Sequence, residues 1–255
     1  MNESARSLAA DVRTGRRSAR EVTLEHLERA HATQSLGALW HLDDAGALRA
    51  AEGVDARRLR GEDPGALAGV PLVVKDSFAV AGMPRSGGIR EPRVDSGDAA
   101  AVARLRSAGV VVLGKAAMHQ LAWGTTGQCP NRPPVLNPRS PGRQPGGSSS
   151  GSAVSVAAGV TPIALGSDTA GSVRVPAAWC GVVGFRPRQE SVSRAGMLPL
   201  APSFDTVGWL AGDVADAQLV AGVLGALRPG VGDGEPTRLR VLVDAAALDA
   251  ASPAL

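Results

Sequence analysis

Short, continuous apolar runs alternate with segments of helical character along most of this 255-residue chain. The clearest runs cover residues 69–75, 109–113 and 162–166, and each begins with glycine or proline. Unbroken apolar character is typical of strands that are buried on both faces of a sheet. Because such strands alternate with helices, the chain is predicted to form an α/β fold whose sheet is covered by helices on both faces.

Helix signals fill most of the stretches between these strands. Residues 18–21 read Ser-Ala-Arg-Glu, a capping box that marks the start of one helix. A long loop rich in glycine, proline and asparagine is expected to run to residue 147. The other predicted helices cover residues 3–15, 43–59, 98–107, 115–122, 150–159, part of 167–178, and 213–226, and further strands cover 181–186 and 238–243.

Composition and charge argue against several classes of function. Basic and acidic residues are mixed along the chain and only 3% of residues are aromatic, so nucleic-acid binding is not expected. No apolar segment reaches the ~20 residues of a membrane span, and the first residues lack the apolar core of a secretory signal. Two cysteines, Cys129 and Cys180, make neither a disulfide framework nor a zinc site. We therefore expect a cytoplasmic protein without membrane contact, metal or cofactor.

Residues 109–116, GVVVLGKA, come close to a phosphate-binding loop but depart from it at two points. Ala116 occupies the position of the metal-binding hydroxyl, and the four spacer residues are apolar, which suits a strand. Lys115 is therefore interpreted as an ordinary residue at a strand end, and nucleotide binding is not predicted.

Lysine is unusually rare in this sequence. Only Lys75 and Lys115 are lysines, whereas the other 25 of the 27 Lys and Arg residues are arginines. Lys75 ends an apolar run. Taken alone, it is better explained as a side chain that snorkels to solvent at a strand end. A catalytic base is the alternative, because burial can deprotonate an amine but not a guanidinium.

Two segments rich in glycine and serine carry the strongest functional signal. The first, QPGGSSSGSAVSVAAG at 144–159, runs from a loop straight into a helix of small residues, which a flexible linker would not do. In the second, GSDTAGSVRVPAAWCGVVGFRP at 166–187, Ser172 lies in a glycine-containing turn between a strand and a short helix. Such a turn can place a nucleophile beside backbone N–H groups that stabilise an oxyanion, although a lone serine there is usually a cap.

Both segments, with VPLVVKDSF, GKAAMHQLAWG and SFDTVGWLA, resemble the amidase signature family over about residues 5–243. The resemblance implies a mixed central sheet that is C-terminally shortened. It implies hydrolysis of the C–N bond of a small-molecule amide through an acyl-enzyme intermediate, with no cofactor and no metal. It also implies a single domain built from an N-terminal helical segment (1–65), the family core (66–243) and a tail (244–255).

The resemblance also implies a Ser-Ser-Lys triad that contains no histidine. In this triad Lys75 is the base, Ser148 the bridging serine and Ser172 the nucleophile, and Ser148 is expected to follow a cis peptide bond. Asp168 and Arg174 are expected mainly to form a buried polar network. The implied site also comprises backbone donors of an oxyanion hole at Thr169, Ala170 and Gly171, supporting side chains at Ser149, Asp168 and Arg174, and a substrate contact at Met118.

Three positions depart from the family pattern. Ala170 stands where glycine is common, Ser167 replaces threonine, and Gln120 replaces an acidic residue. The methyl group of Ala170 matters if this residue needs a positive φ.

Members of the family also usually continue well past the point that matches Leu255. Three outcomes stay open: a naturally short enzyme, an enzyme completed by a partner chain or by a second copy in a homodimer, and an inactive fragment or scaffold. A transamidase component resembling the aminoacyl-tRNA amidotransferase A subunit is a further alternative.

Overall fold

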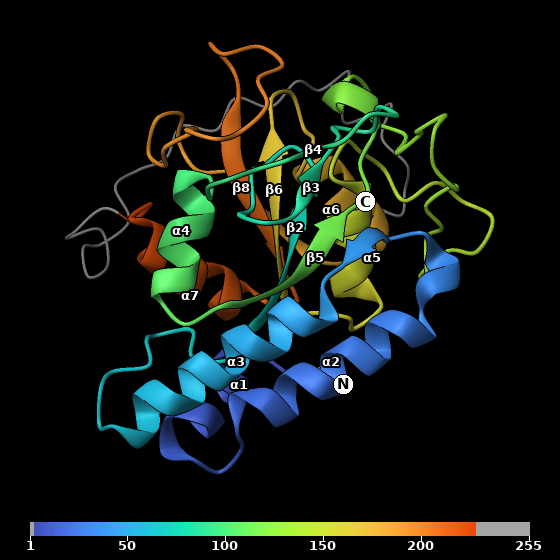
Figure 1. Cartoon of the computed structure of the whole chain (residues 1–255). Helices are drawn as coiled ribbons and strands as arrows, with labels where there is room; N and C mark the ends of the chain where they lie inside the picture. The colour runs from blue at the N-terminus through green and yellow to red at the C-terminus, as the bar shows by residue number, and fades with distance from the viewer. Residues whose placement is uncertain (1–2, 228–255) are drawn as a thin grey trace, which may run out of the picture.

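The computed structural model describes residues 3–227, so the predicted strand at 238–243 and tail at 244–255 lie outside it. A six-stranded mixed sheet forms the centre, with strand order β1-β5-β2-β6-β8-β7 (Figure 1). Strands β5, β2 and β6 are parallel, and β1, β8 and β7 pair antiparallel with their neighbours. The strands of this sheet are β1 (Leu39–Leu42), β2 (Pro71–Lys75), β5 (Val111–Ala116), β6 (Ile163–Asp168), β7 (Val183–Phe185) and β8 (Thr206–Ala211).

Helices cover both faces of the sheet, which confirms the predicted fold class. Helix α4 (Ala100–Ser107) connects β2 to β5, and α5 (Ser150–Ala157) connects β5 to β6 in the opposite direction along the sheet. Because such crossovers are right-handed, the two helices lie on opposite faces. Helix α6 (Arg174–Cys180) packs beside α5, and α7 (Val214–Leu224) packs beside α4.

The N-terminal helices lie at one end of the sheet, below it in Figure 1. They are α1 (Ala5–Thr14), α2 (Ala19–Ala32) and α3 (Asp44–Leu59). The predicted capping box is present at the start of α2, where Ser18 and Glu21 exchange hydrogen bonds with each other's backbone. This part of the chain is not wholly helical, since β1 adds an antiparallel edge strand beside β5.

One predicted helix is wrong. Residues 115–122 do not form a helix, because β5 continues to Ala116, where it pairs with both β1 and β2. Only the short 3-10 turn η2 (Gln120–Ala122) follows, and Leu121 and Ala122 there have left-handed φ values of 52° and 59°. Strand β8 and the small two-stranded sheet of β3 (Pro84–Arg85) and β4 (Arg93–Val94) were not predicted.

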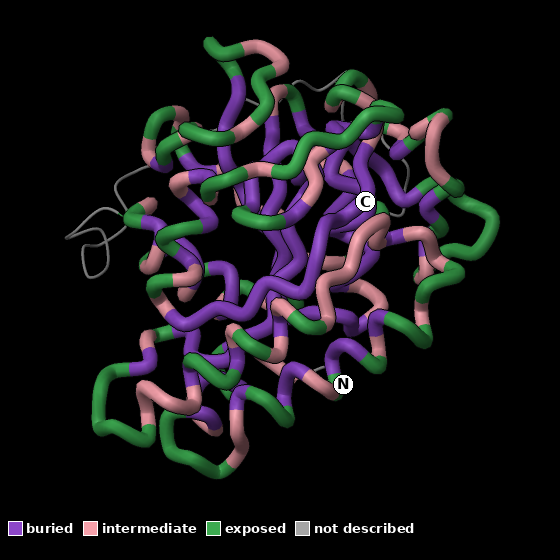
Figure 2. Tube along the Cα trace, viewed as in Figure 1, coloured by how far each residue is buried: buried purple, intermediate pink, exposed green. Residues whose placement is uncertain are grey.

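The central strands are buried along their whole length (Figure 2). Every residue of β2, β5, β6 and β8 is buried, which explains why apolar residues make up most of each strand. The carboxyl ends of β2, β5 and β6 lie together along one edge of the sheet, its carboxyl edge. Here the chain leaves β2 toward β5 in one direction and leaves β5 toward β6 in the opposite direction. Such a switch point is where open α/β sheets bind ligands. Among residues 3–227, no helix is long and apolar enough to cross a lipid bilayer.

Candidate active site

The predicted site residues come together at this carboxyl edge of the sheet. Lys75 is the last residue of β2, and Asp168 is the last residue of β6. Ser148 and Ser149 end the long loop before α5, and Ser172 lies in the turn between β6 and α6. Three separate segments of the chain therefore supply the site.

Lys75 is fully buried among hydroxyl and carbonyl oxygens. Its Nζ lies 2.7 Å from Ser148 Oγ, 2.9 Å from Ser167 Oγ and 3.3 Å from the Ser167 carbonyl oxygen. The three contacts match the three hydrogen-bonding positions of an ammonium group. The snorkelling interpretation is wrong, because none of the Lys75 side chain reaches solvent.

Burial lowers the pKa of Lys75 to about 7, because the protein interior disfavours the charged amine. The carboxylates of Asp168 and Asp205 act in the opposite direction and offset part of this effect. At neutral pH the amine is therefore present in both its charged and its neutral form. The neutral form can accept a proton, which is the property that a general base requires.

The segment with both serines is tied to the turn that carries Ser172. The backbone N–H of Ser149 donates to the Ser172 carbonyl oxygen (3.1 Å), and the N–H of His119 donates to the Ser148 carbonyl oxygen (3.0 Å). The Gly147–Ser148 peptide bond is cis, as the resemblance implies. Within residues 3–227, no hydrogen bond joins the hydroxyl groups of Ser148 and Ser172.

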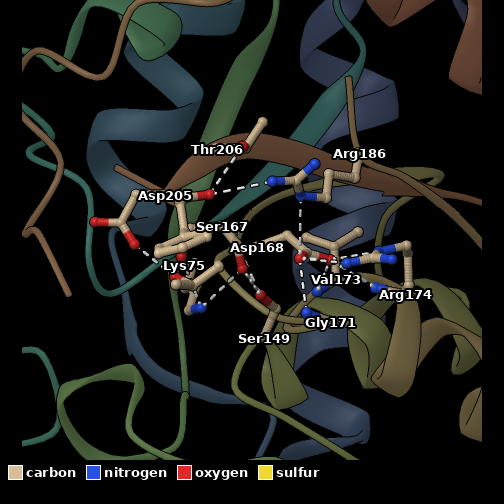
Figure 3. Close-up of polar contacts among 12 residues, drawn as sticks. Lys75, Ser149, Ser167, Asp168, Gly171, Val173, Arg174, Arg186, Asp205 and Thr206 are labelled. Carbon is tan, nitrogen blue, oxygen red and sulfur yellow. Dashed lines mark hydrogen bonds and ion pairs between the residues drawn. The ribbon is translucent and has the colours of Figure 1, made fainter. Parts of the chain in front are cut away.

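Ser149 also supports the site, through the strand beside it. Its Oγ donates to the Ser167 carbonyl oxygen (3.3 Å) and accepts from the Ser167 N–H (3.4 Å). Ser167 in turn contacts Lys75, so Ser149, Ser167 and Lys75 form one connected polar cluster (Figure 3). Ser148 joins this cluster through its hydrogen bond with Lys75. Ser150 begins helix α5.

Asp168 organises the turn around the predicted nucleophile (Figure 3). Its carboxylate accepts from the backbone N–H groups of Gly171 (2.7 Å) and Val173 (3.1 Å). Arg174 donates to both carboxylate oxygens at 3.0 Å, and Arg186 forms an ion pair at 3.3 Å. Burial by itself would raise the pKa of Asp168, but the hydrogen bonds from Arg174, Val173 and Gly171 outweigh it and lower this pKa.

The same contacts bear on the predicted oxyanion hole. The Gly171 N–H is held by Asp168, and the carboxylate does not take the N–H groups of Thr169 or Ala170. Gly171 has a φ of 127°, a value that favours glycine. Ala170 does not have a positive φ and is exposed, so the methyl group in place of hydrogen causes no backbone strain there.

A cavity of about 310 Å³ opens beside Ser172, whose residue is 7% exposed. Its walls come from residues 122–125, from Thr169 and Ala170, and from residues 200–201. The predicted substrate contact Met118 is buried and is not among these lining residues.

Sequence reasoning assigned no role to Asp205, although it lies in the SFDTVGWLA segment. Its carboxylate accepts from Thr169 Oγ1, from the Leu200 N–H (2.8 Å) and from the Ala201 N–H (3.1 Å). Asp205 therefore connects the turn before Ser172 with the wall of the cavity. An acidic residue before an apolar run was the only signal for it in the sequence.

The second lysine, Lys115, is not an ordinary strand-end residue. It is fully buried, and its Nζ lies 3.6 Å from Asp76 Oδ1, which is also buried. The amine also donates to the Phe78 carbonyl oxygen. Burial lowers the pKa of Lys115 to about 8, and the charge of Asp76 opposes this effect. Asp76 also accepts from the N–H and the hydroxyl of Ser86.

Comparison with known proteins places these features in a family. The model of the Amidase family matches residues 21–228. The chain is 42% identical over 253 residues to the A subunit of the Glutamyl-tRNA(Gln) amidotransferase from Salinispora arenicola, covering 97% of this chain and 51% of the relative. It is 44% identical over 220 residues to the protein of the same name from Acidothermus cellulolyticus, covering 85% and 44%.

Solved structures give the same result. A crystal structure of an amidase superposes with a TM-score of 0.82 at 42% identity, covering 88% of this chain and 52% of that chain. The peptide amidase from Stenotrophomonas maltophilia superposes with a TM-score of 0.82 at 34% identity, covering 89% and 48%. The chain therefore spans about half the length of the relatives it matches. On the family match, the fold and the shared sequence, this chain belongs to the amidase family.

Proposed function

We propose that this chain carries the catalytic site of an amidase, which hydrolyses an amide C–N bond through Lys75, Ser148 and Ser172. The observation that carries the proposal is the hydrogen bond of 2.7 Å between Ser148 Oγ and the fully buried amine of Lys75. A pKa of about 7 lets this amine take up a proton at neutral pH. A neutral amine can serve as the base without a carboxylate hydrogen-bonded to it.

The proposed reaction begins when the Ser172 hydroxyl turns to donate to Ser148 Oγ, and a proton then passes from Ser172 Oγ through Ser148 Oγ to Lys75 Nζ. Ser172 Oγ forms a bond to the amide carbonyl carbon, and the carbonyl electrons move onto its oxygen. When the C–N bond breaks, the proton returns through Ser148 to the leaving nitrogen, which departs as ammonia or an amine. Water then attacks the acyl-enzyme along the same proton path, releasing the carboxylic acid and restoring the Ser172 hydroxyl.

The developing oxyanion needs backbone donors beside Ser172. We assign this role to the N–H groups of Thr169 and Ala170, which the Asp168 carboxylate does not occupy. Gly171 would have to release its contact of 2.7 Å with Asp168 to join them. One donor of this type typically contributes about 2.7–4 kcal/mol to lowering the barrier. Asp168 and Arg174 act as supports that hold the turn in place.

Labelling with a fluorophosphonate tests the proposed nucleophile. We expect the wild-type protein to form one covalent adduct at Ser172 and Ser172→Ala to form none. Ser107→Ala, which changes an exposed serine on α4, is the matched control and should label like the wild type. Folded wild-type protein that does not label would contradict the proposal and favour a catalytically silent scaffold.

A second candidate is a role as a transamidase component. The curated relatives from Salinispora and Acidothermus are named as parts of an amidotransferase, and their identity to this chain is above 40%. Such a role needs partner chains and an ammonia acceptor. Co-purification of stable partners, with glutamine-dependent transfer of ammonia, would favour this candidate over the hydrolase.

Completion of the site by another chain is part of the same question. Strand β7 forms one edge of the described sheet and is only three residues long. An edge strand offers unpaired backbone groups to a second copy or to a separate chain. Light scattering during size-exclusion chromatography would separate a homodimer or a heteromer from a monomer.

A further inference from the structure

The cavity beside Ser172 is lined by uncharged side chains. Its lining comprises residues 122–125, Thr169, Ala170, Ser172 and residues 200–201, and none of these side chains is an acid, a base or a histidine. A volume of about 310 Å³ suits one small ligand group. The described walls therefore offer apolar contact, hydroxyl groups and backbone N–H groups, and no charged side chain.

Large apolar side chains are also exposed near this cavity. Trp123 lines the cavity and is 77% exposed, and Leu121 just before it is 51% exposed. Leu198 lies beside Leu121, since both side chains approach the same face of Gly87. An exposed cluster of large apolar side chains next to a cavity is typical of a ligand-binding surface. An aromatic ring with a free face can stack against a flat apolar group.

The charged groups near the cavity are already committed to other partners. Asp205 accepts hydrogen bonds from Thr169, Leu200 and Ala201, and it faces the walls from behind. Arg174 and Arg186 both pair with Asp168. None of these four charged side chains lines the cavity, so the lining residues offer an anionic ligand no cation. A buried charge without a partner is strongly disfavoured.

We propose that this site takes an uncharged primary amide with an apolar, aryl-sized acyl group that packs against Trp123, and that it discriminates against glutamine and other charged amides. This inference rests on the proposed function of the site, and it names the substrate class. Ammonia as the leaving group needs no second pocket. Glutamine is zwitterionic at neutral pH, so it would leave an α-carboxylate and an α-ammonium without partners.

Calorimetric binding to Ser172→Ala tests the substrate class without turnover. We expect phenylacetamide to bind at least tenfold more tightly than either glutamine or the anionic amide succinamate. In the same background Trp123→Ala should weaken phenylacetamide binding about tenfold, whereas Trp123→Phe should keep it within about threefold. The matched control Leu59→Ala removes an apolar side chain that is 74% exposed at the end of α3, and it should leave binding unchanged.

Glutamine or succinamate binding as tightly as phenylacetamide would overturn the inference, and so would binding of none of the three amides. Phenylacetamide binding by the Trp123→Ala variant that is as tight as binding with Trp123 in place would also overturn the inference. Release of ammonia from these amides by the wild type reports separately on the proposed function. Selective binding of phenylacetamide without ammonia release would support the substrate class and refute the hydrolase. Hydrolysis of glutamine faster than that of phenylacetamide would support the hydrolase and refute the substrate class.

Discussion

The two lysines of this chain occupy neighbouring strand ends and yet have different surroundings. Lys75 ends β2 and Lys115 lies near the end of β5, and both are fully buried. Hydroxyl and carbonyl oxygens surround the amine of Lys75, whereas Lys115 has the carboxylate of Asp76 at 3.6 Å. Burial lowers both pKa values, to about 7 and about 8. A nearby carboxylate favours the charged amine, so the partners decide whether a buried lysine serves as a base or as one half of an ion pair.

Strand register explains how two such sites fit side by side. Lys115 pairs with Val74, and Lys75 pairs with Ala116. Because side chains alternate between the faces of a sheet, the two amines point to opposite faces. The site with the two serines lies on the face of α5, and the ion pair with Asp76 lies on the other face.

The largest expected effect comes from replacing Lys75. Lys75→Met should reduce kcat/KM for an amide by about 10²–10⁴-fold, since it removes the general base. The free energy of unfolding should not fall, because methionine fills the site without a buried amine. Lys75→Arg should be as inactive, because a guanidinium cannot give up its proton. Steady-state kinetics and urea unfolding measure both quantities, and an active Lys75→Arg would contradict the assignment of the base.

Replacing Lys115 should affect stability rather than catalysis. Lys115→Met should lower the free energy of unfolding by about 3–5 kcal/mol, because it leaves the buried Asp76 carboxylate unpaired. The double variant with Asp76→Asn should recover a large part of this loss, since no buried charge remains. Urea unfolding of the single and double variants provides the measurement. Equal stability of Lys115→Met and the wild type would show that the pair is not an important structural contact.

Stability should also depend on pH through both lysines. Their folded pKa values of about 7 and about 8 lie below the unfolded value of ~10.4, so the unfolded chain binds more protons in between. The free energy of unfolding should therefore rise with pH from about 7, by up to about 1.4 kcal/mol per pH unit for each lysine. Lys75→Met should abolish the rise between about pH 7 and 8 and roughly halve it above pH 8, where Lys115 still contributes. Urea unfolding across pH 6–9 checks it, and an unchanged slope in Lys75→Met would count against a depressed pKa.

The smallest expected effect comes from the carboxylate of Asp205, which acts on the pKa of Lys75. Activity should rise with pH through about 7, as Lys75 loses its proton. The charge of Asp205 raises the pKa of Lys75, so Asp205→Asn should move this limb of the kcat/KM profile to lower pH. Glu91→Gln, which neutralises an exposed carboxylate elsewhere, should leave the profile in place. A shift to higher pH in Asp205→Asn would refute the electrostatic role.

The sequence predicted the buried parallel strands well because their apolar runs are continuous. It failed where pairing decides the structure. Residues 115–122 resemble a helix locally, but β5 continues to Ala116 because β1 and β2 pair with it on both sides. Strand β8 was missed although it is fully buried, and its Gly208 is needed where the backbone comes close to Val173 and Phe185.

The site was predictable to the extent that local motifs carry it. The serine-rich loop and the turn at Ser172 are each contiguous in sequence. Lys75 was assigned through the resemblance of VPLVVKDSF to the family, since the rarity of lysine alone did not decide between a base and a snorkelling side chain. The role of Asp205 could not be derived, since its contacts with Thr169 and Leu200 exist only in the folded chain. The burial of Lys115 beside Asp76 was hidden for the same reason.

The placement of both lysines inside the fold has a practical consequence for chemical modification. Arginine carries the remaining basic charge, and neither lysine amine is exposed. Reagents that acylate lysine side chains therefore find no such target on the native surface, and the rate at which they modify Lys75 or Lys115 reports how often the ends of β2 and β5 open to water. Peptide mass spectrometry resolves the two positions, so each side of the sheet carries its own built-in reporter of local opening.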